Sequence, residues 1–245
     1  MSQRAPRREN ASTRTQIFGV EHPEDALAVA AAGADHLGFC PAEDPGLSGF
    51  QPCIAAAAAR ALFRQLPDQT ATVLLFATAH EELVLRTTEA ARPDFVQVCW
   101  AVDRLGPERE ARLRERLQPV RWIKEIPVGG SETRGAALEA AERYASCADL
   151  LILDTHADRE WIGATGLVHD WSISAEIVRS ARIPCILAGG LDAGNLRGAL
   201  EAVEPWGVDS YSRTNLPSLR KDLEKVRAFV EVARRFDAER QSRAR

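Results

Sequence analysis

The sequence lacks several features that mark secreted, zinc-binding and membrane proteins. It has only five cysteines among 245 residues, an odd number, and none of them forms a C-x-x-C pair. This argues against a disulfide framework and against a zinc site, and it predicts buried thiols in a reducing compartment. No stretch is both long and apolar enough to predict a membrane span. We therefore expect a cytoplasmic protein without a membrane partner.

The chain also lacks an excess of positive charge. Its formal net charge is -4 at pH 7, whereas a general affinity for nucleic acid needs a concentrated basic surface. We expect no nucleic-acid partner. Residues 1–14 are basic and polar without the apolar segment of a secretory signal. They predict a disordered tail, followed by one domain over 15–235 and a polar, frayed end over 236–245.

The chain does contain a regular alternation of short apolar runs and longer segments with helical periodicity. The predicted strands are 16–19, 36–39, 72–76, 95–99, 122–126, 150–154, 185–188 and 208–210. Pro23 and Pro52 stand where a first helical turn accepts proline, and Gly33 suits a helix C-terminus. Eight alternations predict a single (β/α)8 TIM barrel, and a doubly wound open sheet is the alternative.

Glycines follow two of the predicted strands late in the chain. Gly189 and Gly190 come directly after the seventh strand, and Gly163 and Gly166 lie in the loop after the sixth. In such barrels the chemistry is carried at the C-terminal ends of the strands. Glycine there lets backbone N–H groups approach an anion. The pattern favours a phosphate site, although a glycine pair also serves in plain tight turns.

Several segments, in one order over about 16–232, resemble the phosphoribosylanthranilate isomerase family. They are QIFGV followed by PEDALAVAAAGADHLGF, then FVQV, WIKEI, LLILDT, GATGLVHDWS and ILAGGLDAGNLRGALEAVEPWGVD. The resemblance implies a TIM barrel of the ribulose-phosphate-binding type. It also implies an Amadori rearrangement of an N-aryl phosphoribosylamine, for which neither a metal nor a cofactor is required.

Such a rearrangement needs a general acid and a general base. The resemblance places the acid on Asp154, for which a structural capping role is the alternative. It places the base, a cysteine in the family, on Phe18, which cannot accept a proton. Cys40 and Cys99 are candidate replacement bases if their pKa is lowered, although buried and inert thiols are the favoured account of both.

The presumed substrate loop after the second strand departs from the family as well. The resemblance implies an arginine there for the anthranilate carboxylate, but no lysine or arginine occurs from Thr15 to Ala59. The loop instead carries Glu43 and Asp44, whose charge would repel a carboxylate. The family's fourth-strand histidine and glycine are replaced by Cys99 and Trp100, which fill space.

The remaining candidates follow from the resemblance and from their place in strand-end loops. Arg213 either bonds a phosphate or occupies its site, and for Asp209 structural and site roles are equally favoured. Lys124, His156 and His169 are further polar candidates, for which structural or solvated states are favoured. The predicted substrate and phosphate contacts are Gly163, Thr165, Gly166, Gly189, Gly190, Asp209, Ser212 and Arg213.

Three functions remain open from the sequence. The first is a divergent isomerase of a phosphoribosyl-amine or related phosphosugar, with Asp154 as the acid. The second is a genuine phosphoribosylanthranilate isomerase of tryptophan biosynthesis with a substitute base. The third is a non-catalytic barrel that binds a ligand or a partner protein. The expected small-molecule partner is a phosphorylated sugar or sugar-amine, and the chain is expected to be a monomer or a homodimer.

Overall fold

The structure is a computed structural model that describes residues 12–47, 52–100, 102, 104–129, 133–155 and 168–243. Three predicted phosphate contacts, Gly163, Thr165 and Gly166, lie outside the described residues, as do His156 and residues 1–11. The site is therefore built below from the other strand ends.

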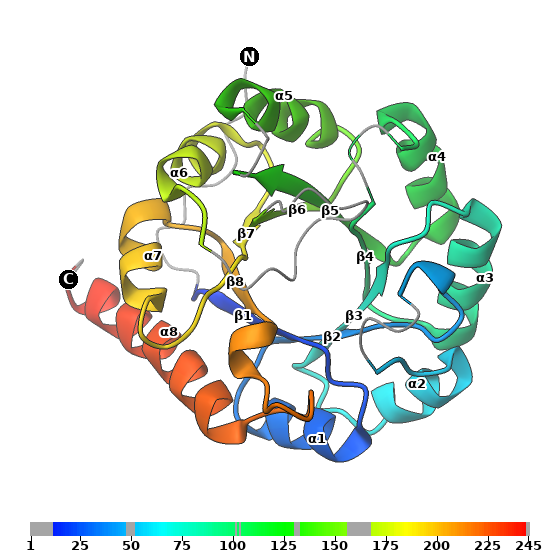
Figure 1. Ribbon diagram of the computed structural model, residues 1–245, viewed down its shortest axis with the longest axis horizontal. Coiled ribbons are helices and arrows are strands. Elements are labelled where there is room, and N and C mark those ends of the chain that lie inside the picture. The colour runs from blue at the N-terminus through cyan, green and yellow to red at the C-terminus, as the bar shows by residue number, and fades with distance from the viewer. Residues whose placement is uncertain are drawn as a thin grey trace.

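Eight parallel strands close into a barrel in the order β1 to β8, with β1 paired to β8 (Figure 1). The β1–β8 pairing excludes the open sheet and confirms the predicted (β/α)8 barrel. The strands are β1 Arg14–Phe18, β2 His36–Phe39, β3 Ala71–Phe76, β4 Phe95–Val98, β5 Arg121–Val128, β6 Leu150–Thr155, β7 Cys185–Leu187 and β8 Gly207–Ser210.

Eight helices alternate with the strands and surround the barrel (Figure 1). They are α1 Pro23–Ala31, α2 Ala56–Phe63, α3 Glu81–Ala91, α4 Pro107–Leu117, α5 Arg134–Tyr144, α6 Trp171–Ser180, α7 Leu196–Val203 and α8 Leu223–Arg243, with short 3-10 turns at Pro45–Leu47 (η1) and Ser212–Thr214 (η2). Within the described residues no helix combines the length and apolar character needed to cross a membrane.

Local signals explain most helix ends. Pro23 begins α1 and Gly33 follows its end with φ of 90°, as the sequence predicts. Thr133 and Asp170 cap α5 and α6 by accepting the N–H of Ala136 and Ser172. The prediction for Pro52 is wrong, because α2 begins only at Ala56. The segment before it pairs instead with the end of β2 through the Pro41–Ile54 bridge.

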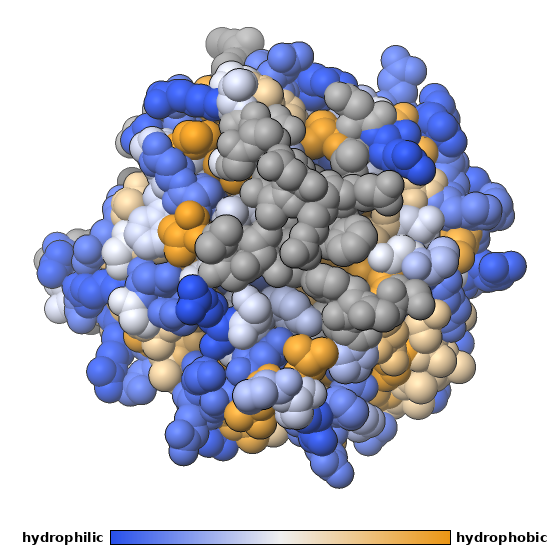
Figure 2. Space-filling model, in the orientation of Figure 1, coloured by the Kyte–Doolittle hydropathy of each residue, from blue (hydrophilic) through white to orange (hydrophobic). Residues whose placement is uncertain are grey.

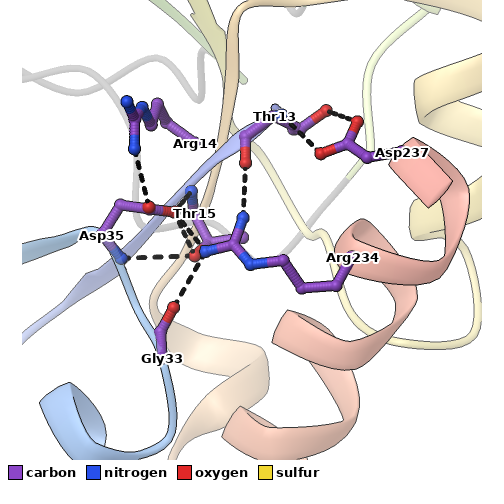
Figure 3. Close-up of polar contacts among 7 residues, drawn as sticks. All are labelled: Thr13, Arg14, Thr15, Gly33, Asp35, Arg234 and Asp237. Carbon is purple, nitrogen blue, oxygen red and sulfur yellow. Dashed lines mark hydrogen bonds and ion pairs between the residues drawn. The ribbon is translucent and has the colours of Figure 1, made fainter. Parts of the chain in front are cut away.

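The described residues near both ends of the chain are tied together. The backbone N–H and hydroxyl of Thr13 donate to the Asp237 carboxylate at 2.6 and 2.8 Å (Figure 3). Arg234 donates to the Thr13 carbonyl and to the Asp35 carboxylate. These bonds hold the start of β1 against α8. β1 begins at Arg14, within the predicted tail over 1–14, and α8 continues to Arg243, within the predicted frayed end over 236–245. The domain boundaries stay a prediction.

Strand alternation divides the core into two regions. Outward side chains pack against the helices in the larger apolar cluster, which includes Ile17, Leu37 and Leu151. Inward side chains fill the barrel in layers. A second apolar cluster supplies part of this filling: Val73, Phe95, Ile123, Leu150, Ile152, Ile186 and Ala188. The polar side chains that share the interior with it decide what the barrel can do.

Candidate active site

Three carboxyl groups converge in the barrel on the side of β5, β6 and β8. Asp154 lies near the end of β6, partly exposed, and its Oδ1 accepts the Thr155 N–H at 2.6 Å. Glu125 on β5 and Asp209 on β8 are buried. One oxygen of each, Glu125 Oε1 and Asp209 Oδ1, has no hydrogen-bond partner. An unsatisfied buried oxygen is costly, so these two atoms are expected to meet a ligand or a solvent donor.

Burial and mutual repulsion keep protons on this group. Burial, followed by the charge of Asp154, raises the pKa of Glu125 well above its usual value. The same two causes raise the pKa of Asp209 to about 8. The Asp209 carboxyl is therefore predominantly protonated near neutral pH, and the protonated form of Glu125 is favoured, beside the partly exposed Asp154. Among the described residues no cluster of three or more histidine, cysteine or acidic side chains has a metal-binding arrangement.

A chain of amide side chains crosses the barrel below these carboxyls. Gln97 donates to Glu125 Oε2 at 3.1 Å and accepts from Gln16 at 3.1 Å. The oxygen of Gln16 in turn lies 3.3 Å from Nδ1 of His36. The chain links the walls of β1, β2, β4 and β5, and it fixes the orientation of the Glu125 carboxyl.

The opposite side of the barrel mouth is apolar. Phe18 at the end of β1 packs with Cys40, Leu47, Leu75 and Cys99, from the ends of the next strands and η1. Its ring lies over Gly38 so closely that a Cβ at Gly38 would come within 2.1 Å of it. The aromatic ring thus fills the space beside the strand end where the resemblance implies a catalytic cysteine, and Phe18 itself is only 6% exposed.

The two candidate replacement thiols lie in this apolar cluster. Cys40 and Cys99 are both buried. Burial, more than any nearby charge, raises the pKa of both thiols well above the usual range. A thiolate is therefore disfavoured at both positions, which agrees with the favoured expectation of buried, inert thiols.

Both acidic side chains of the loop after β2 accept hydrogen bonds from backbone N–H groups. Asp44 is buried, and its carboxylate accepts the N–H groups of Gly46, Ala77 and Thr78. Glu43 accepts the N–H of Ala56 and so caps α2. The loop carries negative charge as predicted, but these bonds give both carboxylates a local structural role.

The glycine pair after β7 has the backbone geometry of a close approach. Gly189 and Gly190 have φ of 90° and 60°. A Cβ at Gly189 would lie 2.2 Å from the hydroxyl oxygen of Thr155 and 3.2 Å from Asp154 Oδ1. Glycine is required here, because a side chain would push the end of β7 away from the acid. Ser212 and Arg213 lie exposed in η2 after β8. Phosphate binding at these positions stays a prediction.

Two further candidates differ from their expected surroundings. Lys124 points away from the barrel interior into a cage of Trp100, Tyr144 and Glu110, with Nζ 3.0 Å from Glu110 and both charges fully buried. It therefore has the structural role and cannot reach a substrate in the mouth. His169 is buried and not solvated, between the hydroxyls of Thr155 and Ser174 at 3.1 and 2.6 Å. Burial lowers its pKa to about 4.

Sequence reasoning missed two ionisable residues at the mouth, Glu21 and Lys221, and it placed Glu125 at a strand end without giving it a role. All three are buried. Alternation along β5 was a usable signal for Glu125, since Ile123 and Glu125 share one face of the strand while Trp122 and Lys124 share the other. For Glu21 and Lys221 the sequence offered only their place in loops after β1 and β8. Their burial depends on how those loops pack together.

The face of the molecule seen in Figure 2 is hydrophilic around much of its rim, and hydrophobic residues form separate patches. Among the described residues the large exposed hydrophobic side chains are Leu27, Val168, Leu216 and Leu219. Leu216 and Leu219 belong to the turn between η2 and α8.

Comparisons with known proteins agree with this architecture. The family model described as N-(5'phosphoribosyl)anthranilate (PRA) isomerase matches residues 15–232. The curated isomerase of Methanocella arvoryzae is 37% identical over 91% of this chain and 98% of its own length. That of Pseudomonas putida is 34% identical, again over 91% and 98%.

A solved structure supports the same relation. The phosphoribosyl anthranilate isomerase of Thermus thermophilus superposes with a TM-score of 0.72 at 28% identity, over 91% of this chain and 99% of that one. The match spans the whole barrel, including the strand ends that carry Phe18, Asp154 and Gly189. This chain therefore belongs to the N-(5'-phosphoribosyl)anthranilate isomerase family, and it is an isomerase.

Proposed function

We propose that this protein isomerises N-(5'-phosphoribosyl)anthranilate to the corresponding 1-(arylamino)-1-deoxyribulose 5-phosphate, a step of tryptophan biosynthesis. The observation that carries the proposal is the position of Asp154, near the C-terminal end of β6 and beside the protonated Glu125 and Asp209, in a chain that matches the isomerase family over 15–232. The relatives are named for this reaction.

Asp154 acts as the general acid in this proposal. It donates a proton to the ribose ring oxygen, the C1–O bond breaks, and an iminium forms between C1 and the aryl nitrogen. A base then removes the C2 proton to give the enolamine. The same base returns that proton to C1, while the Asp154 carboxylate accepts the enol hydroxyl proton. Acid and base are regenerated, and the reaction is a net isomerisation.

In this proposal, residues at the other strand ends bind the substrate. The backbone at Gly189 and Gly190, with Arg213 nearby after β8, binds the phosphate. The partner-free oxygens Glu125 Oε1 and Asp209 Oδ1 serve the ribose hydroxyls. Support for the phosphate assignment comes from the positive φ angles of the two glycines and the exposure of Arg213.

One observation favours a second candidate, an isomerase for a phosphoribosyl-amine whose aryl or amine group has no carboxylate. Among the described residues the members of the apolar cluster around Phe18 include no cation, and the sequence has no lysine or arginine from Thr15 to Ala59. A carboxylate on that side of the mouth would therefore lack the arginine that the resemblance implies.

The test is an assay of the purified protein with N-(5'-phosphoribosyl)anthranilate, in which loss of its fluorescence is followed over time. We expect turnover in the wild-type protein and its loss in Asp154→Asn. A His169→Gln variant serves as a matched control at the same end of β6, because it changes a buried polar group and leaves the Asp154 carboxyl in place. Wild-type turnover no greater than that of Asp154→Asn overturns the proposal and moves the search to amines without a carboxylate.

A further inference from the structure

Glu21 follows β1 at the same end of the barrel as Phe18. After Phe18 the chain turns at Gly19, which has φ of 76°, and Glu21 comes two residues later. Its side chain is buried, with 8% of the residue exposed, and Oε1 accepts the Cys40 N–H at 3.2 Å. The backbone of β2 thus fixes a carboxyl above the apolar cluster that surrounds Phe18.

The groups around Glu21 come from several neighbouring elements. The charge of Lys221, which precedes α8, lowers the pKa of Glu21. The charge of Glu21 in turn raises the pKa of Cys40, Cys53 and Tyr211. Lys221 is 3% exposed. Its Nζ donates to Asn215 Oδ1 at 2.6 Å and lies 5.1 Å from the Tyr211 ring centre. The neighbourhood therefore offers one buried cation to the Glu21 carboxylate.

These surroundings give Glu21 a protonation equilibrium suited to proton transfer. Burial raises the pKa of its carboxyl to about 7, against the opposing effects of backbone N–H groups and of Lys221. A base works best when its pKa lies near the operating pH. Among the described residues, the other carboxyls and thiols of the mouth are less suited, since Asp209 retains its proton, the protonated form of Glu125 is favoured, and a thiolate is disfavoured at Cys40 and Cys99.

We propose that Glu21 is the general base that takes the C2 proton, at the strand end where the family's cysteine is replaced by Phe18. This inference rests on the proposed function and adds the group that the mechanism lacks. β1 is separated from β6 by β8 and β7 around the barrel. Glu21 and Asp154 therefore reach a substrate in the mouth from different walls, as an acid at the ring oxygen and a base at C2 require.

The proton balance closes on these two residues. The Glu21 carboxylate takes the proton from C2 as the C1–C2 double bond of the enolamine forms. Protonated Glu21 then delivers it to C1, while the enol hydroxyl gives its proton to the Asp154 carboxylate and the C2 carbonyl forms. No oxidant, metal or further reactant enters the step.

The experiment compares wild-type protein with Glu21→Gln, using Glu43→Gln as the matched control. Both substitutions keep an oxygen that can accept a backbone N–H, from Cys40 and Ala56 respectively, so both variants are expected to fold. We measure kcat across pH 5–9 and the effect of deuterium at C2 of the substrate. Thermal unfolding is followed alongside to show that the variants are folded.

Glu21→Gln is expected to lower kcat by about 10²–10⁴-fold. It should also remove the rise in kcat centred near pH 7 and increase the deuterium effect, while Glu43→Gln matches the wild type in all three. If Glu21→Gln keeps the wild-type kcat and the rise in kcat near pH 7, the assignment of Glu21 as the base is overturned and the proposed function stands. Wild-type protein without turnover overturns both.

Discussion

The two sides of the barrel mouth have opposite chemistry. The side of β1 to β4 is apolar, with Phe18 packed among Cys40, Leu75 and Cys99. The side of β5 to β8 holds Asp154 and two buried carboxyls, of which Glu125 is hydrogen-bonded to a chain of amides. The same barrel geometry supports both, because each strand end projects one side chain into the mouth whatever its type.

Under the proposed function, the difference shows how one barrel can have an acid at Asp154 without the cysteine base that the resemblance places at Phe18. The carboxyl side is constrained by mutual contacts: Gly189 has to be glycine for β7 to approach Asp154, and Gln97 orients Glu125. On the apolar side Phe18 gains packing from the room above Gly38. A phenylalanine there stabilises the fold, but it requires any proton acceptor to come from a neighbouring loop.

The largest expected effect is on the carboxyl side. Asp154→Asn should lower kcat by about 10²–10⁴-fold, since the amide cannot protonate the ring oxygen. Its melting temperature should stay close to that of the wild type, because Asp154 is partly exposed and an amide oxygen can still accept the Thr155 N–H. Steady-state kinetics and a melting curve test this. A kcat within tenfold of wild type would contradict the assignment of Asp154 as the acid.

The next effect is on the apolar side and concerns stability. Phe18→Ala should lower the free energy of unfolding by about 3–5 kcal/mol, because a buried ring is removed and a cavity remains. Urea unfolding at pH 7 measures it, and Phe18→Leu, which retains most of the volume, should cost less than half as much. Equal losses in the two variants would show that Phe18 does not stabilise by filling space.

A smaller effect concerns the carboxyl side and the way in which stability depends on pH. The folded-state pKa of Asp209 is about 8, above its ordinary value of 3.8. The unfolded chain therefore loses this proton first, and stability falls as pH rises from about 4 to about 8. Asp209→Asn removes that loss, so its stability relative to wild type should improve as pH rises from 4 to 8, by at most about 1.4 kcal/mol for each pH unit. Urea unfolding of both proteins at these pH values tests the sign.

The smallest effect concerns the substrate's aryl group. If the apolar side holds the ring without a cation, removing the anthranilate carboxylate should change kcat/KM by less than tenfold, or about 1.4 kcal/mol. Parallel assays with the phosphoribosyl adducts of anthranilate and aniline measure the ratio. A loss of a hundredfold or more with the aniline adduct would mean that a cation outside the 15–59 segment reaches the carboxylate.

The alternation of strands and helices was fixed by the sequence pattern alone. His36–Phe39 was predicted to the residue, and the other strands to within two residues at either end. This worked because buried parallel strands are short apolar runs and the helices between them have strong local signals. Asp154, Gly189 and Gly190 could be placed at strand ends for the same reason.

Only the tertiary structure decided the environments of the charged residues. Glu21 and Lys221 lie 200 positions apart in the chain, yet they are neighbours because β1 pairs with β8 to close the barrel. Lys124 and Glu125 are adjacent, yet strand alternation buries one behind the barrel and the other inside it. Burial and the proximity of distant charges set a pKa, and neither is a local property of the sequence. The sequence therefore determined the barrel, whereas its closure determined which groups hold and move protons.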